Sequence, residues 1–383
     1  MKFDNLVIFV ADSLRYDFSP DGLMDTGVKF KTVAQSTHSP PSFSTLSTGL
    51  YPYQHGVHGW TDKIPADIET VFDVETHETG YFQRGSPAQD PMYTILDVES
   101  STPLSDLNEP FIYMERHDAT HVPFSGTNVR SFSEYFRTRA NDYEQIREEY
   151  KTGVEIACDR FQSILDTLAE NNQLDNTLAV FTSDHGEQLG EADDVAHSSP
   201  ITPELAYVPT HFINPSLQPA EFEMNPDESI IEHVDVIRTV LEAAGIELGN
   251  HQPGSNLLNE SRTDEFGLTT VKNRMGTFDI YSADSIWWRE GGYEFCSNSR
   301  VLRLAFAVYR NFLGAESPAT LLSREFVGNH ISRVNEFGAC QKTVDEANEL
   351  LNEKLKGIEE RDSSSFEISN RQRDRLKKLG YIE

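Results

Sequence analysis

Carboxylate and imidazole groups follow two apolar runs of strand length. Asp12 comes directly after the run at residues 5–11, and Asp184 and His185 come soon after the run at residues 178–181. Two aspartates and one histidine are suitable ligands for a divalent cation such as Mn²⁺, Zn²⁺ or Mg²⁺. Asp12 alone is more typical of a turn or a helix cap, and Asp184-His185 is also consistent with a polar loop. Their matching positions after two strands favour a metal site.

A nucleophile is expected beside such a cation, and the segment at residues 37–45 is rich in hydroxyl groups. Coordination to a divalent cation lowers the pKa of a hydroxyl and makes it nucleophilic. Composition does not choose among these hydroxyls, because Ser39 and Ser42 are also suitable helix caps. Pro40 and Pro41 suit the turn just before a helix, so we expect a helix from Ser42.

Alternating strands and helices must position these groups. Continuous apolar strands are typical of a parallel sheet that is buried on both faces. We therefore expect an α/β fold with a mostly parallel central sheet sandwiched by helices, whose carboxyl edge collects the ligands. The expected strands are residues 5–11, 111–114, 178–181 and 207–213, and the expected amphipathic helices are residues 143–168 and 230–244.

The pattern changes after about residue 258. Short apolar segments there suggest antiparallel strands, and a charged helical tail follows from Val344. We expect a catalytic domain at residues 1–260 and a smaller C-terminal subdomain at residues 261–383 that contains a short antiparallel sheet. The short segments are residues 287–288, 293–296 and 301–309.

The charge balance of the 383-residue chain excludes one class of partner. There are 62 acidic and 32 basic residues, for a net charge of −30, and only 11 of the basic residues are lysines. Such a surface repels nucleic acid and anionic membranes, so neither is expected as a partner. High acidity with few lysines is typical of proteins from halophilic organisms. An anionic substrate would need local positive charge at its site, most simply a metal.

The sequence gives no sign of export or of membrane insertion. We find no apolar window of 18 residues and no secretory signal at the N-terminus, so we expect no membrane span and a cytoplasmic location. Three widely spaced cysteines and the absence of a CxxC motif argue against a disulfide framework or a zinc knuckle.

The hydroxyl-rich segment resembles the sulfatase signature, with matches at Ser39, Pro41, Ser42, Leu46 and Thr48-Gly49. Other segments are similar to further family motifs in the same order along the chain. We therefore identify the chain as resembling the sulfatase branch of the alkaline phosphatase superfamily. These other segments are Val10-Ala-Asp-Ser-Leu-Arg-Tyr-Asp17, Phe181-Thr-Ser-Asp-His-Gly-Glu187, His233-Val-Asp-Val-Ile-Arg-Thr239 and Lys378-Leu-Gly-Tyr381.

The resemblance implies a role for each matching residue. Asp12, Asp184 and His185 would ligate one divalent metal ion (Mn, Zn, Ca or Mg), and Ser39 would be both a metal ligand and the nucleophile. His121, in His-Val-Pro-Phe124, resembles a family motif that contacts the substrate anion, and His197 lies where the family often has a His or Lys. We expect the neighbouring histidines to be structural. These are His38, His55 and His117.

One departure from the family pattern bears on the substrate. Sulfatases usually convert the first signature residue to formylglycine, and that conversion depends on an Arg four positions later, where this chain has Phe43. We therefore expect an unmodified Ser39. A plain serine lacks the exit route that the formylglycine hydrate gives a sulfate adduct, whereas water can attack a phosphoserine at phosphorus. This favours a small anionic phosphate or phosphonate ester, with sulfate esters as a further possibility.

The expected activity is metal-dependent ester hydrolysis through a covalent intermediate on Ser39. Two alternatives stay open from the sequence. One is a transferase of the phosphoglycerol or phosphoethanolamine type, which differs only in its acceptor pocket. The other is a non-catalytic relative that binds an anion or a glycan.

Overall fold

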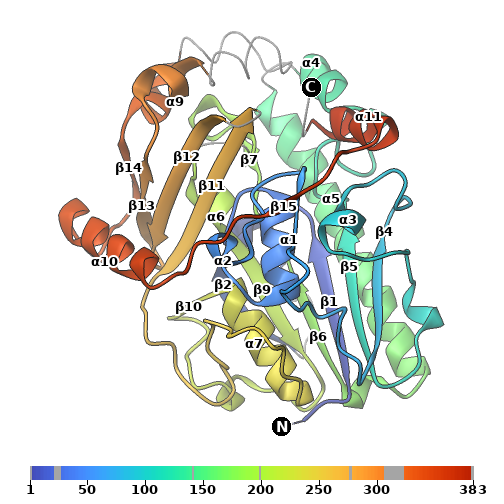
Figure 1. Cartoon of the computed structure of the whole chain (residues 1–383). Helices are drawn as coiled ribbons and strands as arrows, with labels where there is room; N and C mark the ends of the chain where they lie inside the picture. The colour runs from blue at the N-terminus through green and yellow to red at the C-terminus, as the bar shows by residue number, and fades with distance from the viewer. Residues whose placement is uncertain are drawn as a thin grey trace.

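The computed structural model describes residues 2–20, 27–139, 142–197, 200–275, 278–305 and 323–380. Its centre is a seven-stranded sheet in the order β10-β2-β9-β6-β1-β5-β4 (Figure 1). Strand β9 is antiparallel to both neighbours, and the other strands share one direction, which confirms the mostly parallel sheet. The strands are β1 (Asn5–Ala11), β2 (Gly27–Val33), β4 (Glu78–Gln83), β5 (Phe111–His117), β6 (Thr177–Thr182), β9 (Tyr207–Ile213) and β10 (Ile230–Glu232).

Strand β1 lies inside this sheet, and both of its faces are covered. Its even-numbered side chains at residues 6–10 pack in the same core as helices α1 (Ser39–Thr48) and α7 (His233–Ala244). Its odd-numbered side chains at residues 7–11 pack in a second core with α5 (Tyr143–Glu170). Because neither face meets water, the strand is apolar throughout. The two layers of helices confirm the expected sandwich.

Two helix starts differ from the sequence prediction. Helix α1 begins at Ser39 rather than Ser42, because Pro40 and Pro41 occupy its first turn, where their missing N–H groups have no helical partner to lose. The helix predicted at residues 230–244 begins only at His233, because the three residues before it pair with β2 as the edge strand β10.

A second, antiparallel sheet follows in the C-terminal part, as expected. It contains β11 (Gly267–Met275), β12 (Phe278–Trp287), β13 (Gly291–Cys296) and β14 (Val334–Gly338) in that order. The strand predicted at residues 301–309 is wrong for residues 301–305, which are helical; residues 306–309 lie outside the described part. Its apolar side chains face solvent, and the side chain in the buried position is Arg303, which donates to the carbonyls of Ile331 and Ser332.

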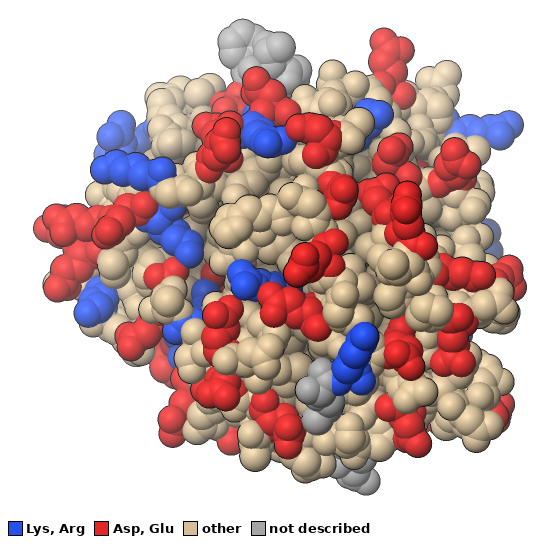
Figure 2. Space-filling view, turned by 60° about the horizontal axis from the view of Figure 1, so that its bottom comes forward, with Lys and Arg blue, Asp and Glu red and all other residues tan. Residues whose placement is uncertain are grey.

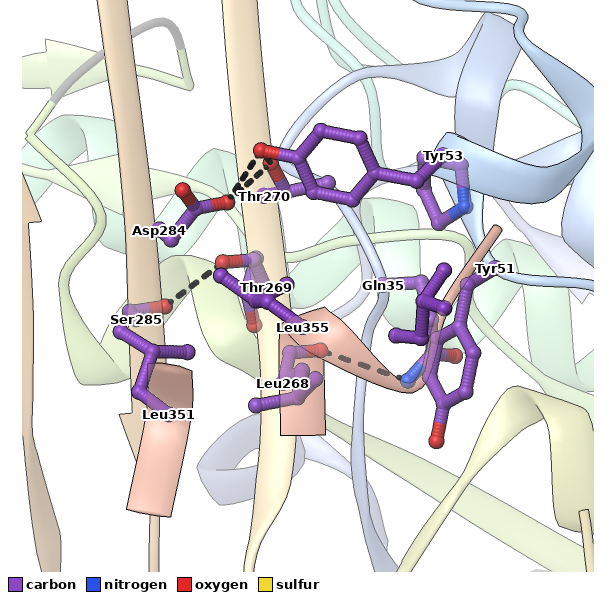
Figure 3. Close-up of a pocket in the computed structure, with 12 residues that line it drawn as sticks. Gln35, Tyr51, Tyr53, Leu268, Thr269, Thr270, Asp284, Ser285, Leu351 and Leu355 are labelled. Atoms are coloured by element: carbon purple, nitrogen blue, oxygen red, sulfur yellow. Dashed lines mark hydrogen bonds between the residues drawn. The ribbon is translucent and has the colours of Figure 1, made fainter. Parts of the chain in front are cut away.

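The second sheet is packed on both sides. Helix α10 (Val344–Lys356) covers one face, and the other face packs against the β2 and β9 side of the central sheet. Figure 3 shows a crevice at this junction, where the Tyr53 hydroxyl donates to Asp284 Oδ1 at 2.8 Å and Thr270 Oγ1 donates to the same atom at 2.7 Å. The domain boundary near residue 260 stays a prediction.

The C-terminal residues return to the first part of the chain. Strand β15 (Ser364–Ser365) pairs with β3 (Asp62–Lys63), and α11 (Asn370–Leu379) packs beside α4 (Phe132–Arg139). In the described residues, we find no helix with the length and apolarity that a membrane span requires. The remaining short elements are α2 (Pro52–His55), α3 (Met92–Ile95), β7 (Gln188–Leu189), β8 (Val195–Ala196), α6 (Pro203–Ala206) and α9 (Arg324–Ile331).

Acidic side chains dominate the face of the molecule in Figure 2, with Lys and Arg interspersed among them. This distribution agrees with the net charge of −30. Repulsion among so many like charges destabilises a compact chain unless salt screens it.

Candidate active site and metal centre

The predicted metal ligands meet at the carboxyl ends of two neighbouring strands. Strand β1 pairs with β6 in parallel, so Asp12 after β1 lies next to Asp184 and His185 after β6. His185 Nε2 lies 3.4 Å from Asp184 Oδ2 and 3.9 Å from Asp12 Oδ1. One ligand atom from each residue lies within 4.8 Å of the others, and all three side chains are fully buried. The structure therefore brings together the side chains that the sequence selected.

The local hydrogen bonds leave two atoms of this cluster available as ligands for a cation. The backbone N–H groups of Ser13 and His185 both donate to Asp184 Oδ1, whereas the buried Oδ2 has no hydrogen-bond partner in the described part of the chain. His185 Nδ1 lies 2.9 Å from the carbonyl of Gly186. Because a carbonyl only accepts, Nδ1 carries the proton and the Nε2 lone pair points to the cluster. An orphaned carboxylate oxygen and an oriented imidazole fit a divalent cation.

The pKa shifts of the two aspartates are also consistent with a cation at this cluster. Burial and the negative charge of Asp12 raise the pKa of Asp184. Burial opposes ionisation of Asp12 as well, but Arg116, His121 and His185 outweigh it and hold the pKa of Asp12 well below its usual range. Two buried carboxylates this close together need more positive charge than one guanidinium, and a divalent cation would supply it.

Ser39 is the hydroxyl of the helix α1 segment that reaches this cluster. Its Oγ lies 3.4 Å from His185 Nε2, and the side chain is fully buried. The hydroxyls of Ser42 and Ser44 instead donate to the backbone carbonyls of Ser36 and Pro40. By position, Ser39 is the best nucleophile candidate of these three hydroxyls.

Arg116 is a site residue that the sequence analysis missed. Its guanidinium donates to Asp12 Oδ2 from Nε at 2.8 Å and from Nη2 at 2.5 Å, and Nη2 also lies 3.3 Å from Ser39 Oγ. The guanidinium carbon lies 5.4 Å from the ring centre of Phe43, the residue at the family's Arg position. The positive charge at this site therefore comes from β5 and not from α1.

A signal for Arg116 was present in the sequence. It comes two residues after the apolar run at residues 111–114, and β5 pairs with β1 so that Arg116 aligns with Val10. The rule that located Asp12 and Asp184, that functional groups follow apolar strands, also applies to this strand.

The two predicted catalytic histidines lie beside the cluster. The His197 ring centre is 4.6 Å from that of His185 and 5.1 Å from that of His121. His197 Nδ1 lies 3.4 Å from both carboxyl oxygens of the buried Glu187, whose pKa is raised well above its usual value by burial. Burial lowers the pKa of His121 to about 3, so this imidazole is neutral near pH 7.

The other nearby histidines lie farther from the cluster or are engaged elsewhere. His55 accepts from the Val57 N–H through Nδ1, and its Nε2 lies 3.2 Å from Thr45 Oγ1, so both ring nitrogens serve the turn after α1. His38 precedes α1, and its ring centre is 6.2 Å from that of His197. His117 ends β5 and packs on Phe9 with ring centres 5.6 Å apart.

Comparisons with known proteins agree with the fold. The family model described as Sulfatase matches residues 94–246. The chain is 30% identical to the low-salt glycan biosynthesis sulfotransferase Agl7 of Haloferax volcanii, over 99% of this chain and 96% of that protein. It is also 22% identical to a sulfatase of Formosa agariphila over 75% of this chain and 60% of that protein.

Solved structures share the fold at low sequence identity. The 2-O GAG sulfatase BT1596 superimposes with a TM-score of 0.62 at 15% identity, covering 93% of this chain and 91% of that one. The phosphonate monoester hydrolase of Agrobacterium radiobacter gives a TM-score of 0.59 at 15% identity, covering 76% and 87%. Together with the full-length similarity to Agl7, these findings show that the chain belongs to the sulfatase family of the alkaline phosphatase superfamily.

Proposed function

We propose that this protein is a group-transfer enzyme that moves a sulfuryl group from a sulfate ester to a hydroxyl of a glycan, with Ser39 as the covalent carrier. The observation that carries the proposal is the buried Ser39 hydroxyl within 3.4 Å of both His185 Nε2 and Arg116 Nη2. The similarity of this protein, over 99% of its chain, to a glycan sulfotransferase supports group transfer over hydrolysis. The sequence had favoured hydrolysis of phosphorus esters, with transfer as an alternative.

The first step is attack by Ser39 Oγ on the sulfur of the donor. Ser39 Oγ loses its proton as the sulfur–oxygen bond forms, the bond from sulfur to the donor oxygen breaks, and that oxygen takes up a proton. A divalent cation held by Asp12, Asp184 and His185 would lower the pKa of a coordinated hydroxyl and offset the charge of sulfuryl oxygens. Arg116 keeps its Nη2 near Ser39 Oγ, where it stabilises negative charge on that atom.

The second step returns Ser39 to its starting form. An acceptor hydroxyl attacks the sulfur and loses its proton, the bond from sulfur to Ser39 Oγ breaks, and Ser39 Oγ takes up a proton. Because the adduct is a plain serine sulfate, the attack must take place at sulfur. The cluster is fully buried, and an acceptor held beside the sulfur reacts at a high effective concentration, which favours it over water.

In this scheme, one neighbouring histidine contacts the sulfuryl group and the other exchanges a proton with the reacting oxygens. We assign His121 as a neutral donor to a sulfuryl oxygen, because its low pKa keeps it uncharged. We assign His197, whose Nδ1 lies 3.4 Å from both carboxyl oxygens of the buried Glu187, as the group that exchanges a proton with a leaving or attacking oxygen.

The test is to trap the carrier. The protein is incubated with 4-nitrophenyl sulfate in concentrated KCl with Mn²⁺, and its peptides are mapped by mass spectrometry. We expect a sulfuryl adduct on Ser39 that disappears when a glycan acceptor is added and the sulfated glycan appears. The Ser39→Ala variant should form no adduct, whereas the matched Ser42→Ala control should form it. Release of inorganic sulfate at the same rate with and without acceptors would show a hydrolase instead.

A further inference from the structure

A narrow pocket runs along the cluster at the edge where β4 and β5 end. Its inner wall includes Asp12, Arg116 and His121, and its outer wall includes residues of the C-terminal helix α11. In Figure 1, α11 lies near the top of the molecule, above the labels of β4 and β5. The complete lining is Asp12, Gln83, Arg84, Arg116, Asp118, His121, Arg375 and Leu379.

Gln83 contributes an unused hydrogen-bond donor to this pocket. The residue is only 3% exposed. Its Oε1 accepts a hydrogen bond from the Tyr81 hydroxyl at 2.9 Å, so the amide nitrogen Nε2 needs a partner of its own. Nε2 has no hydrogen-bond partner among the described residues. A buried donor without a partner is destabilising, so an acceptor that enters the pocket here gains a hydrogen bond at no competing cost.

Two further arginines form the outer rim. The exposed Arg84 forms no ion pair within the described part of the chain. Arg375 of α11 lies beside it, where its Nη2 donates to the Arg84 carbonyl at 2.8 Å and its Nε lies 3.0 Å from Asp90 Oδ2. Gly85 makes this approach possible, because a Cβ there would lie 2.6 Å from Arg375 Nη1. The rim is therefore built to hold a guanidinium from α11 against the end of β4.

The charge around the pocket is opposite to that of the molecule. Five of the ten residues of α11 are Arg or Lys and one is Asp, whereas the whole chain has a net charge of −30. In the pocket lining, Arg116 is paired with Asp12 and Arg375 with Asp90, which leaves Arg84 as the lining arginine without an ion pair among the described residues. Asp118 is the other carboxylate in the lining. Arg84 and the basic residues of α11 make this rim more positive than the acidic protein as a whole, which favours an anion there.

We infer that this pocket binds a second anionic group of the donor, a sulfate or a carboxylate near the sulfate ester that is cleaved, through Gln83 Nε2, Arg84 and Arg375. This inference rests on the proposed function, because it takes the ester to lie at Ser39. It narrows the substrate class to compounds with at least two anionic groups, and it assigns the C-terminal helix a role in substrate selection.

The experiment measures binding, not turnover, by calorimetry on the full chain in concentrated KCl. The probes are glucosamine 6-O-sulfate and glucosamine 2-N,6-O-disulfate. We expect the disulfate to bind about tenfold more tightly, the equivalent of one charge-assisted hydrogen bond. The ratio should fall towards one in Arg84→Ala and in Gln83→Leu. Arg373→Ala, an exposed change on α11 outside the pocket lining, should keep it.

Two further measurements separate the contributions of the anion type and of the individual pocket residues to binding. N-succinyl-glucosamine 6-O-sulfate, which carries a carboxylate in place of the second sulfate, shows which anion the pocket prefers. Raising KCl should weaken the contribution of the exposed Arg84 more than that of the buried Gln83, because the Debye length falls to about 3 Å at 1 M salt.

Equal binding of the monosulfate and the disulfate by the unaltered protein would overturn the inference. A preference that survives both Arg84→Ala and Gln83→Leu would overturn it as well. Failure of the proposed function would look different: the preference for the disulfate would be present and sensitive to these variants, but Ser39 would carry no adduct.

Discussion

Replacing Arg116 by methionine should show how far the free energy of unfolding depends on positive charge beside Asp12. Methionine keeps an apolar side chain against Phe43 and Trp60 but removes both hydrogen bonds to Asp12 Oδ2. Removing one partner of a buried ion pair costs about 3–5 kcal/mol, because the other charge is left buried without compensation. A cation at the cluster would supply part of the missing charge, so the loss should be smaller when metal is bound.

The assay is denaturant unfolding in concentrated KCl, with chelator and with Mn²⁺. We expect Arg116→Met to lose about 3–5 kcal/mol of unfolding free energy with chelator and clearly less with Mn²⁺. Arg147→Met is the control, since that arginine is 39% exposed and lies 3.5 Å from Glu191. Surface pairs of this kind contribute about 0–1 kcal/mol. Equal stability of Arg116→Met and the unaltered protein in chelator would refute the reasoning.

The same substitution should slow transfer. Arg116 Nη2 lies 3.3 Å from Ser39 Oγ, so the variant lacks a donor at the attacking oxygen. Loss of one such donor lowers kcat by about 10²–10³-fold in other enzymes. Measured with saturating Mn²⁺, kcat should fall by that order while the helical signal in circular dichroism is unchanged. A fall in activity that tracks only the unfolded fraction would assign Arg116 a purely structural role.

Three other predictions follow from buried or repelling charges. Arg262→Met should lose about 3–5 kcal/mol in urea unfolding, since Arg262 is buried with Glu232 and Asp235; a loss below 1 kcal/mol would contradict this. Burial lowers the pKa of His55 to about 3, so the unfolded chain binds more protons between pH 6.5 and 3. The contribution of His55 should therefore cost no stability above pH 6.5 and about 1.4 kcal/mol of unfolding free energy per pH unit below it, and His55→Gln should reduce the slope of the whole protein by that amount. The net charge of −30 predicts loss of structure in dilute buffer and recovery in KCl by circular dichroism; an unchanged spectrum without salt would contradict it.

The sequence predicted the central sheet because its strands are buried on both faces. A continuous apolar run such as β1 has few alternatives, and the carboxyl edge then places Asp12 with Asp184 and His185. The sequence prediction was less successful where apolar side chains are exposed and a charged side chain is buried. At residues 301–305 the apolar side chains are exposed while Arg303 is buried, so an apolar pattern gave the wrong element.

The site was predicted in part for a related reason. The cluster of Asp12, Asp184 and His185 follows from strand ends, whereas the preference for Ser39 over Ser42 as the nucleophile candidate depends on where α1 begins, three residues earlier than predicted. Arg116 follows a predicted strand, but its contact with Asp12, which is remote in sequence, is revealed only by the pairing of β1 with β5. The α11 pocket also depends on the return of the C-terminal residues to the first part of the chain, which no local pattern indicates.

The most direct test of the central claim is equilibrium dialysis of Mn²⁺ with the unaltered protein and with Asp184→Asn. The substitution keeps the shape of the side chain but removes the charge of a carboxylate whose Oδ2 has no hydrogen-bond partner among the described residues. We predict one tightly bound Mn²⁺ per chain that is lost or strongly weakened in Asp184→Asn, with Ser42→Ala unchanged. Equal Mn²⁺ binding by Asp184→Asn and the unaltered protein would contradict a metal centre at Asp12, Asp184 and His185.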